Sequence, residues 1–346
     1  MDGPTISDVA RLAGVSAKTV DRAVNGSPLL NEETHAKVRR AIAETGFVPD
    51  FAVRPLEPGR NPLIFLLHDD PLASALTEAQ AGMSAALQGS GWLLCVEQLD
   101  RGANAEAGFK AFLEHHRPAG ILLMPPLSEQ DRLAGLAWEY GCRCARLGAE
   151  PQHDAPGWAF TPDRQGTREA IAWLIEMGHR RIGLISGRED LRSARLRELG
   201  YLDAMAEHGL DRGPSLIASG DDTFESGFAA AELLLEVSPS PTAIFVSNDD
   251  MAAGAIHAAV SRKIQVPTAL SVLGFDDAPI ASRICPPLTS VRVPLLEMAY
   301  VATQALIDPE VTASPPCEFP LELIERGSVA PPQAATGAPS AFFQAG

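Results

Sequence analysis

Aspartate and asparagine side chains occur shortly after apolar segments at three places in the sequence. The pairs are Asp69-Asp70, Asn248-Asp249 and Asp276-Asp277. Carboxylate and amide groups form paired hydrogen bonds with neighbouring hydroxyl groups, so these positions could bind a polyol such as a sugar. The same residue types also cap a helix that follows a strand. We expect the capping role for Asp249 and Asp277. We expect ligand binding for Asn248 and Asp276, with Asp70 as a further candidate.

The apolar segments that must position these side chains have the composition of buried strands. They comprise residues 63–67, 92–96, 120–124, 182–185, 243–246 and 271–275, and Ala- and Leu-rich segments separate them. Continuous apolar runs are typical of parallel strands buried on both faces, so the pattern predicts two Rossmann-like α/β lobes with right-handed crossovers. Ligands bind at the carboxyl ends of such strands, and a cleft between two lobes would bring several of these ends around one cavity.

The first 46 residues have the pattern of three short helices. Thr5 and Asp8 form a capping pattern before the first helix, and Gly14 ends that helix. Ser16 is the expected N-cap of the second helix, and the third helix is expected over residues 31–46. Two helices of about eight residues joined by a short turn, with a third packed against them, are the architecture of a helix-turn-helix. The periodicity alone is equally compatible with a generic three-helix cap.

Residues 5–26, TISDVARLAGVSAKTVDRAVNG, resemble the N-terminal headpiece of the LacI/GalR family of bacterial transcription regulators. The resemblance continues at Gly178-His-Arg-Arg-Ile, Ser247-Asn-Asp, Val272-Leu-Gly-Phe-Asp-Asp and Pro286-Pro-Leu-Thr-Ser-Val, and covers residues 5 to about 330. It implies a homodimer whose headpieces bind double-stranded operator DNA. It also implies a core like that of periplasmic binding proteins, which binds a small effector, commonly a sugar. Relief of repression by the effector is the commoner mode in the family.

The second helix of such a headpiece lies in the major groove, with its N-terminal residues at the base edges. The side chains expected to read bases are Ala17, Lys18 and Arg22, and Arg22 can donate two hydrogen bonds to one guanine. Short polar side chains near the helix ends are expected to meet phosphates. These are Thr5, Ser16, Thr19 and Asn25. The alternative for Thr5 and Ser16 is a purely structural role as caps. Asp21 departs from the family pattern, and its carboxylate should repel phosphates or pair with a neighbouring cation.

Residues 47–60 correspond to the hinge of the family, which forms a short helix on the operator and inserts a leucine into the minor groove. Leu56 matches that leucine, and Arg54 matches an arginine found in some members. Pro55 departs from the pattern, because proline inside a helix costs about 3 kcal/mol and favours extended geometry at the preceding residue. We therefore expect a helix no longer than residues 50–54, or an extended strap.

The resemblance also implies further effector-binding residues. Arg197 lies in Ser193-Ala-Arg-Leu-Arg-Glu-Leu-Gly-Tyr, which is similar to a family segment whose arginine contacts the effector. Asp163 is a further candidate. Sugar-binding relatives often place a stacking aromatic residue where this chain has Asp221-Asp222-Thr223, so that Phe224 is the nearest ring. Either Phe224 takes that role or the stacking is lost, which would make the cavity more polar.

The expected organisation is an all-α headpiece at 1–46, a linker at 47–60, an α/β core at 61–330 and a disordered tail at 331–346. The first lobe of the core should comprise residues 61–162 and 293–320, and the second lobe residues 163–292 and 321–330. The net charge of −16 falls wholly on residues 61–346, because residues 1–60 contain eight basic and eight acidic residues. The tail has no leucine heptads, which favours a dimer over a coiled-coil tetramer.

The remaining motifs favour a binding protein over an enzyme. The sequence has no dinucleotide or phosphate loop, no nucleophile elbow and no zinc-protease motif, so we expect no catalysis and no cofactor. Five scattered cysteines predict reduced thiols and no metal site, and the absence of a long apolar run predicts a cytoplasmic protein with no membrane partner. The competing function is a soluble sugar-binding module that has lost DNA binding.

Overall fold

The computed structural model describes residues 5–24, 32–45, 61–69, 74–99, 105–151, 157–308 and 316–333. The chain divides into two units, Met1–Arg54 and Pro55–Gly346, which are described separately below. Several sequence predictions lie outside the described residues. These are the hinge with Arg54 and Leu56, the candidates Asn25 and Asp70, and the tail after residue 333.

The N-terminal unit contains the three predicted helices, α1 (Ile6–Ala13), α2 (Ala17–Val24) and α3 (Glu32–Thr45). The Asp8 carboxylate accepts hydrogen bonds from the backbone N–H and the hydroxyl of Thr5, and Gly14 ends α1 with a left-handed φ of 69°. The helices enclose a small core whose fully buried members are Val9, Ala10, Val20, Val38 and Ala41. This arrangement confirms the predicted helix-turn-helix, since α1 and α2 are joined at Gly14–Ser16 and supported by α3.

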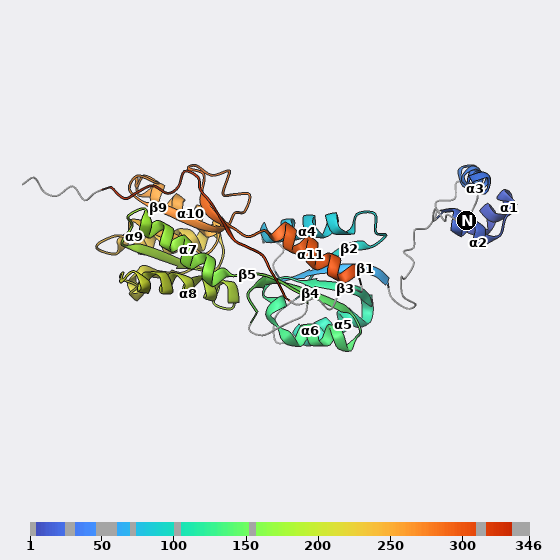
Figure 1. Cartoon of the computed structure of the whole chain (residues 1–346), viewed down its shortest axis with the longest axis horizontal. Coiled ribbons are helices and arrows are strands. Elements are labelled where there is room, and N and C mark those ends of the chain that lie inside the picture. The colour runs from blue at the N-terminus through green and yellow to red at the C-terminus, as the bar shows by residue number, and fades with distance from the viewer. Residues whose placement is uncertain are drawn as a thin grey trace, which may run out of the picture. The chain divides into compact units, whose positions relative to one another are not determined.

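The first lobe of the larger unit contains a sheet with the strand order β11-β5-β4-β3-β1-β2. Its strands are β1 (Asn61–His68), β2 (Leu93–Gln98), β3 (Pro118–Leu123), β4 (Arg143–Ala149), β5 (Trp158–Thr161) and β11 (Cys317–Glu318). Helices α4 (Ser74–Leu87) and α11 (Leu295–Ile307) cover one face of the sheet. Helices α5 (Ala105–His116) and α6 (Asp131–Glu139), with the 3₁₀ turn η1 (Leu127–Glu129), cover the other face (Figure 1).

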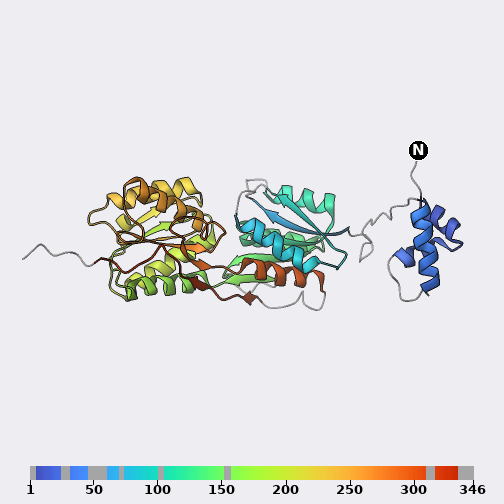
Figure 2. The same cartoon turned by 90° about the horizontal axis from the view of Figure 1, so that it is seen from above.

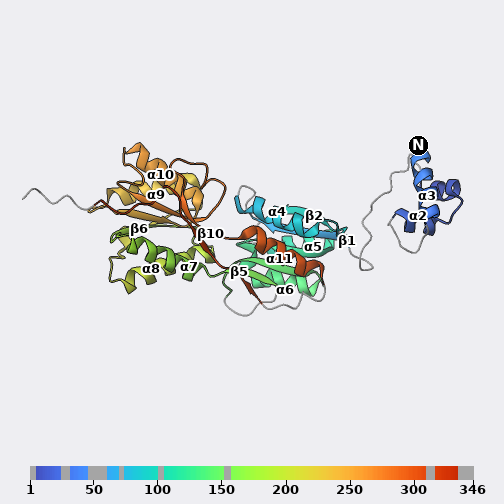
Figure 3. The ribbon, with the colours of Figure 1, turned by 45° about the horizontal axis from the view of Figure 1, so that its top comes forward.

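The second lobe repeats this architecture with the strand order β12-β10-β9-β8-β6-β7. Its strands are β6 (Ile182–Ser186), β7 (Ile217–Ser219), β8 (Ala243–Val246), β9 (Ser271–Asp276), β10 (Thr289–Arg292) and β12 (Glu322–Ile324). Helices α7 (Asp163–Glu176) and α8 (Arg192–Glu207) lie on one face of the sheet. Helices α9 (Phe224–Glu236) and α10 (Asp249–Ser261) lie on the other face (Figure 3). A 3₁₀ turn, η2 (Pro214–Leu216), precedes β7.

The chain passes between the lobes at Pro162, at residues 293–294 and at residues 319–321 (Figure 2). Each lobe is thus completed by a segment that returns from the other lobe. The two lobes can therefore change their relative angle by small rotations at these crossings while their sheets stay intact.

The predicted α/β class is confirmed, with two local corrections. The segment at 92–96 forms β2 but is not buried on both faces, because β2 is the edge strand of its sheet and Leu93 is 50% exposed. The sheet of the second lobe is not entirely parallel, because β12 pairs with β10 in the antiparallel direction. Both corrections concern sheet edges, where a strand is covered on fewer sides and needs no continuous apolar run.

Candidate functional site

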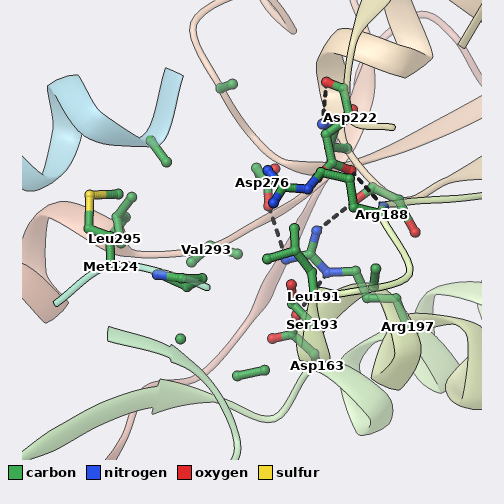
Figure 4. A pocket seen from close by; sticks show the side chains of 18 of the residues that line it. Met124, Asp163, Arg188, Leu191, Ser193, Arg197, Asp222, Asp276, Val293 and Leu295 are labelled. Atoms are coloured by element: carbon green, nitrogen blue, oxygen red, sulfur yellow. Dashed lines mark hydrogen bonds and ion pairs between the residues drawn. The ribbon is translucent and has the colours of Figure 1, made fainter. Parts of the chain in front are cut away.

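A cavity of about 420 Å³ lies between the two lobes of the core. This volume is within the range of about 300–1,000 Å³ that is usual for small-molecule sites. The first-lobe wall is largely apolar and includes Met124, Leu147 and Met298. The second-lobe wall is polar, and its charged side chains gather around Arg197 (Figure 4). A ligand that fits this cavity would place carbon atoms against one lobe and polar groups against the other.

Arg197, on α8, is the centre of the polar wall. Its guanidinium donates to Asp163 at 2.7 Å and pairs with Asp276 at 3.1 Å. It also donates to the backbone carbonyl of Ser247 and lies 3.8 Å above the centre of the Phe275 ring. Figure 4 shows Arg197 between the two carboxylates. The Arg197 side chain is only 11% exposed. Through these contacts it holds the start of α7 and the ends of β8 and β9 together.

At the start of α10 the structure gives the capping role to Asn248 rather than to Asp249, and Asn248 also lines the cavity. Asn248 is the N-cap: its amide oxygen accepts from the Met251 N–H at 2.8 Å. Asp249 is 1% exposed and accepts hydrogen bonds from the Ser290 hydroxyl and the Ala278 N–H, each at 2.7 Å. The expected capping role of Asp249 is therefore wrong. Its carboxylate turns away from the helix end and links α10 to the strands beside it.

The expected capping role of Asp277 is also wrong. The residues that follow β9 form turns and no helix, so there is no helix N-terminus for Asp277 to cap. Its carboxylate pairs with Arg292 at 2.8 Å and with Arg326 at 2.6 Å. Asp277 thus ties the end of β9 to β10 and to the chain after β12, while Asp276 faces the cavity.

The structure brings together five of the six effector-binding candidates. Asp163, Arg197, Phe224, Asn248 and Asp276 line the cavity. The sixth candidate, Asp70, lies outside the described residues. Phe224 is the first residue of α9, is 37% exposed, and its ring centre lies 5.8 Å from that of His257.

Several polar lining residues were not predicted from the sequence. They include Glu78, Arg188, Ser193, Asp222, Ser247 and Asp250, while Asp69, which also lines the cavity, belongs to the strand-end pair Asp69-Asp70. The signal for Arg188 was present, because it follows the predicted strand that becomes β6 just as Asn248 follows β8. Asp222 was recognised as a departure from the family without a role. Glu78 lies in the interior of α4, and no sequence pattern marks it as a lining residue.

Polar contacts of Arg188 and Arg192 connect the two lobes. Arg188 of the second lobe pairs with Asp69 of the first lobe at 3.3 Å. The backbone N–H of Arg192, at the start of α8, donates to the Glu129 carboxylate at 3.0 Å, and the Arg192 side chain donates to the Glu150 carbonyl at 2.6 Å. These contacts are specific to the present angle between the lobes, so a change of that angle must break or lengthen them.

The carboxyl groups of the site have perturbed proton affinities. Burial raises the pKa of Asp276 to about 7, although the Arg197 guanidinium opposes the shift. Burial also raises the pKa of Asp222 and the pKa of Glu78. Outside the cavity, burial raises the pKa of Glu129 to about 7 and that of Asp249 to about 8. Loss of water is the first cause in every case, so these carboxylates ionise at a cost that a cation nearby would reduce.

We expect the core to become less stable between about pH 4 and about pH 8. Asp249 has a pKa of about 8 in the folded core, against 3.8 for an ordinary aspartate, so the folded state binds the additional proton between these values. Stability is then fully present at low pH and falls as the pH rises through the folded pKa. Urea unfolding should show that each such carboxyl contributes a loss of up to about 1.4 kcal/mol per pH unit between its unfolded and folded pKa values. Asp249→Asn should remove the share of Asp249, while Asp276 and Glu129, whose pKa values are raised to about 7, retain theirs. Glu225→Gln, at an exposed position, is the control, and an unchanged pH slope in Asp249→Asn would contradict the assignment.

In the N-terminal unit, Ala17 and Lys18 are exposed at the start of α2, as the expected base contacts require. The Ser16 hydroxyl accepts from the Thr19 N–H at 3.1 Å and bonds to the Thr19 hydroxyl at 2.9 Å. Ser16 is therefore a helix cap, and Thr5 has a similar role through Asp8. Arg22 lies within α2, but its side chain is outside the described set.

Within the described segments, no three side chains of His, Cys, Asp or Glu are placed to hold a metal ion together. All five cysteines are free thiols in the structure. No helix in the described part of the chain has the length and apolar character that crossing a membrane requires.

Comparison with known families and proteins gives matches to both units. The family described as "Bacterial regulatory proteins, lacI family" matches residues 5–50, and the "Periplasmic binding protein-like domain" matches residues 171–329. The HTH-type transcriptional regulator AscG of Escherichia coli (strain K12) is 31% identical over 332 residues, which cover 95% of this chain and 99% of AscG. The HTH-type transcriptional regulator CelR of Thermobifida fusca is 31% identical over 315 residues, which cover 88% of this chain and 91% of CelR.

Solved structures show the same architecture. The lac repressor dimer bound to operator and the anti-inducer ONPF has a TM-score of 0.83 and 26% identity, over 95% of this chain and 100% of that chain. The transcriptional regulator CelR in complex with cellobiose has a TM-score of 0.70 and 29% identity, over 94% of this chain and 99% of that chain. The similarity thus extends over the three-helix unit as well as the two lobes.

Proposed function

This chain belongs to the lacI family of bacterial regulatory proteins, and from this premise we propose that it binds an operator through its three-helix unit under the control of a small, hydroxyl-rich effector in the interlobe cavity. The observation that carries the proposal is the length of the similarity. AscG matches 95% of the chain, so both the DNA-binding unit and the core are retained. We propose a homodimer, as in the operator complex of the lac repressor, and a cytoplasmic location, where operator DNA is accessible.

We propose that α2 enters the major groove and that Ala17, Lys18 and Arg22 read base edges. Thr5, Ser16, Thr19 and Asn25 would contact phosphates or hold the helix ends, and Arg54 and Leu56 would act in the hinge between residues 47 and 60. Support comes from the exposed start of α2 and from the cap at Ser16, which fixes the orientation of its first turn.

We propose that the effector binds between Arg197, Asp163, Asn248, Asp276 and Phe224. Asp70 follows the same strand as Asp69, which lines the cavity, and we retain it as a candidate. A ligand that contacts both walls would favour one angle between the lobes, and this angle would set the spacing of the two headpieces in a dimer. Such coupling is typically about 1–3 kcal/mol and reciprocal. The Arg197 ion pairs hold Asp163 and Asp276 as acceptors, which suits binding rather than catalysis.

A mobility-shift experiment on full-length protein tests the proposal. A duplex selected from a random pool should bind specifically, and an effector found by thermal-shift screening should weaken that binding at least about fivefold. The duplex should weaken effector binding by the same factor. If the protein binds the effector but shifts no duplex, the chain is a sugar-binding module without DNA function, and the proposal fails.

The affinity for operator should fall less steeply with salt concentration than it would with a strongly basic headpiece. The first 60 residues contain as many acidic as basic residues, and α2 carries Asp21 beside its cations. Few phosphates are then neutralised, and the slope of log affinity against log salt follows the number of phosphates neutralised. We expect a slope clearly less steep than about −10, measured by fluorescence anisotropy at several salt concentrations. A slope of about −10 or steeper would contradict this prediction.

A further inference from the structure

The interlobe cavity has more carboxylates than cations. Its described lining residues include six acidic side chains, Asp69, Glu78, Asp163, Asp222, Asp250 and Asp276, and two basic ones, Arg188 and Arg197. Both guanidiniums already pair with carboxylates: Arg197 with Asp163 and Asp276, and Arg188 with Asp69 and Asp190. The formal net charge of these lining residues is thus −4, the difference between two basic and six acidic side chains.

The surplus lies on both walls of the cavity. Glu78 belongs to α4 of the first lobe, and its charged neighbours are Asp277 and Glu297, which disfavour its ionised form, and Arg292, which favours it. Asp222 lies on the second lobe beside Arg188, and one of its carboxylate oxygens accepts from the Arg188 backbone N–H at 3.4 Å (Figure 4). Gly187 leaves the space for this carboxylate, since a Cβ there would overlap it. Asp222 is thus built into the wall rather than loose at its surface.

A second observation points to a ligand at the same place. The hydroxyl of Ser247 is buried, lines the cavity and has no hydrogen-bond partner. Its neighbour Asn248 caps α10 and donates to the Asp222 carbonyl at 3.0 Å, so the Ser247 side chain is held beside the acidic wall. A buried hydroxyl without a partner is costly, and a ligand with a polar hydrogen or acceptor at that point would remove the cost.

Resting on the proposed function, we propose that the effector is a hydroxylated small molecule with a protonated amine, such as an amino sugar, and that acidic sugars and phosphosugars are excluded. The amine would lie in the acidic lining to which Asp222 and Glu78 both contribute, where it reduces the net negative charge of the cavity. Phe224, at the same wall, can add a cation–π contact. A uronate or phosphate would instead add negative charge to a cavity whose guanidiniums are already paired.

The test uses ligands that differ in charge on one skeleton, added to the full-length protein at constant ionic strength. The probes are D-glucosamine, D-glucose and D-glucuronate, and the achiral pair tris(hydroxymethyl)aminomethane and pentaerythritol, which avoids dependence on sugar stereochemistry. Thermal unfolding should show stabilisation by the amines, with an affinity at least about tenfold higher than that of the matched neutral compound. Tetramethylammonium chloride controls for charge without hydrogen bonding and should have no effect.

Two variants assign the effect to the cavity. Asp222→Asn and Glu78→Gln should each reduce the preference for the amine over the neutral probe severalfold, while Glu225→Gln, at an exposed position of α9, should retain it. Equal or tighter binding of the neutral or acidic compound overturns the proposal, as does the absence of amine-specific stabilisation across both series. Operator binding is measured on the same preparation, so a wrong ligand class with intact operator binding is distinguished from a failure of the regulatory function.

Discussion

Replacing Arg197 with methionine is expected to lower the free energy of unfolding of the core by about 3–5 kcal/mol, the usual cost of removing one partner from a buried ion pair. Asp163 is 1% exposed, and its carboxylate would lose the guanidinium at 2.7 Å. Asp276 would lose its partner as well, at 3.1 Å. Methionine retains much of the volume above the Phe275 ring, so the loss of stability is caused by the missing charge rather than by a cavity.

Urea unfolding followed by tryptophan fluorescence measures this loss, because Trp158 and Trp173 lie in the two lobes. Arg195→Met is the matched control: Arg195 lies on the same helix but is exposed, and its loss should cost less than about 0.5 kcal/mol. Adding Asp276→Asn to Arg197→Met should restore part of the stability, since it removes one of the two carboxylates that have lost the guanidinium. A loss below about 1 kcal/mol in Arg197→Met would mean that water replaces the guanidinium, and the central role of Arg197 would be wrong.

The same variant separates stability from regulation. At a temperature where the core of Arg197→Met remains folded, the N-terminal unit should still bind operator, because its own core of Val9, Val20 and Val38 is independent of Arg197. Effector release should be lost, because Arg197 joins the elements that the ligand would contact. Intact operator binding with no effector response is the expected pair of results.

The sequence predicted the architecture well because its signals are local. Gly14 and the caps at Thr5 and Ser16 fix the ends of short helices, and short apolar runs rich in β-branched and aromatic residues, such as residues 243–246, favour a buried strand. Strand β4 was missed because it contains two arginines. The structure buries one of them, Arg146, between Asp131 at 2.8 Å and the Trp158 ring at 4.2 Å, a solution that depends on residues distant in sequence.

The site was predicted only in part, because several of its contacts join residues that are distant in sequence. The ends of predicted strands indicated Asn248 and Asp276, and the family resemblance indicated Arg197. A position after a strand does not reveal which residue of an adjacent pair caps the following helix. At Asn248 and Asp249 the choice follows from Ser290, which lies on β10 and whose hydroxyl donates to the Asp249 carboxylate. Glu78 reaches the cavity from a helix of the other lobe, so its role becomes visible only when the lobes face each other.

Removal of both Lys18 and Arg22 is expected to weaken specific operator binding by about 100- to 1,000-fold, since a good contact to a base edge is worth about 1–3 kcal/mol. The spacing of four residues predicts that both belong to one face of α2, and the exposure of Lys18 indicates that this face is open to a ligand. The loss should be concentrated on the selected sequence, because base contacts specify and phosphate contacts do not.

The measurement compares the selected duplex with an unrelated duplex of equal length at one salt concentration. Arg22→Ala alone should relax the preference at a single guanine position, and binding to the unrelated duplex should change much less. Lys37→Ala, at an exposed position of α3, is the control, because any effect there should be equal for both duplexes. If the Lys18→Ala/Arg22→Ala protein lost affinity equally for both duplexes, α2 would contact the backbone only, and sequence recognition would have to come from the hinge around Leu56.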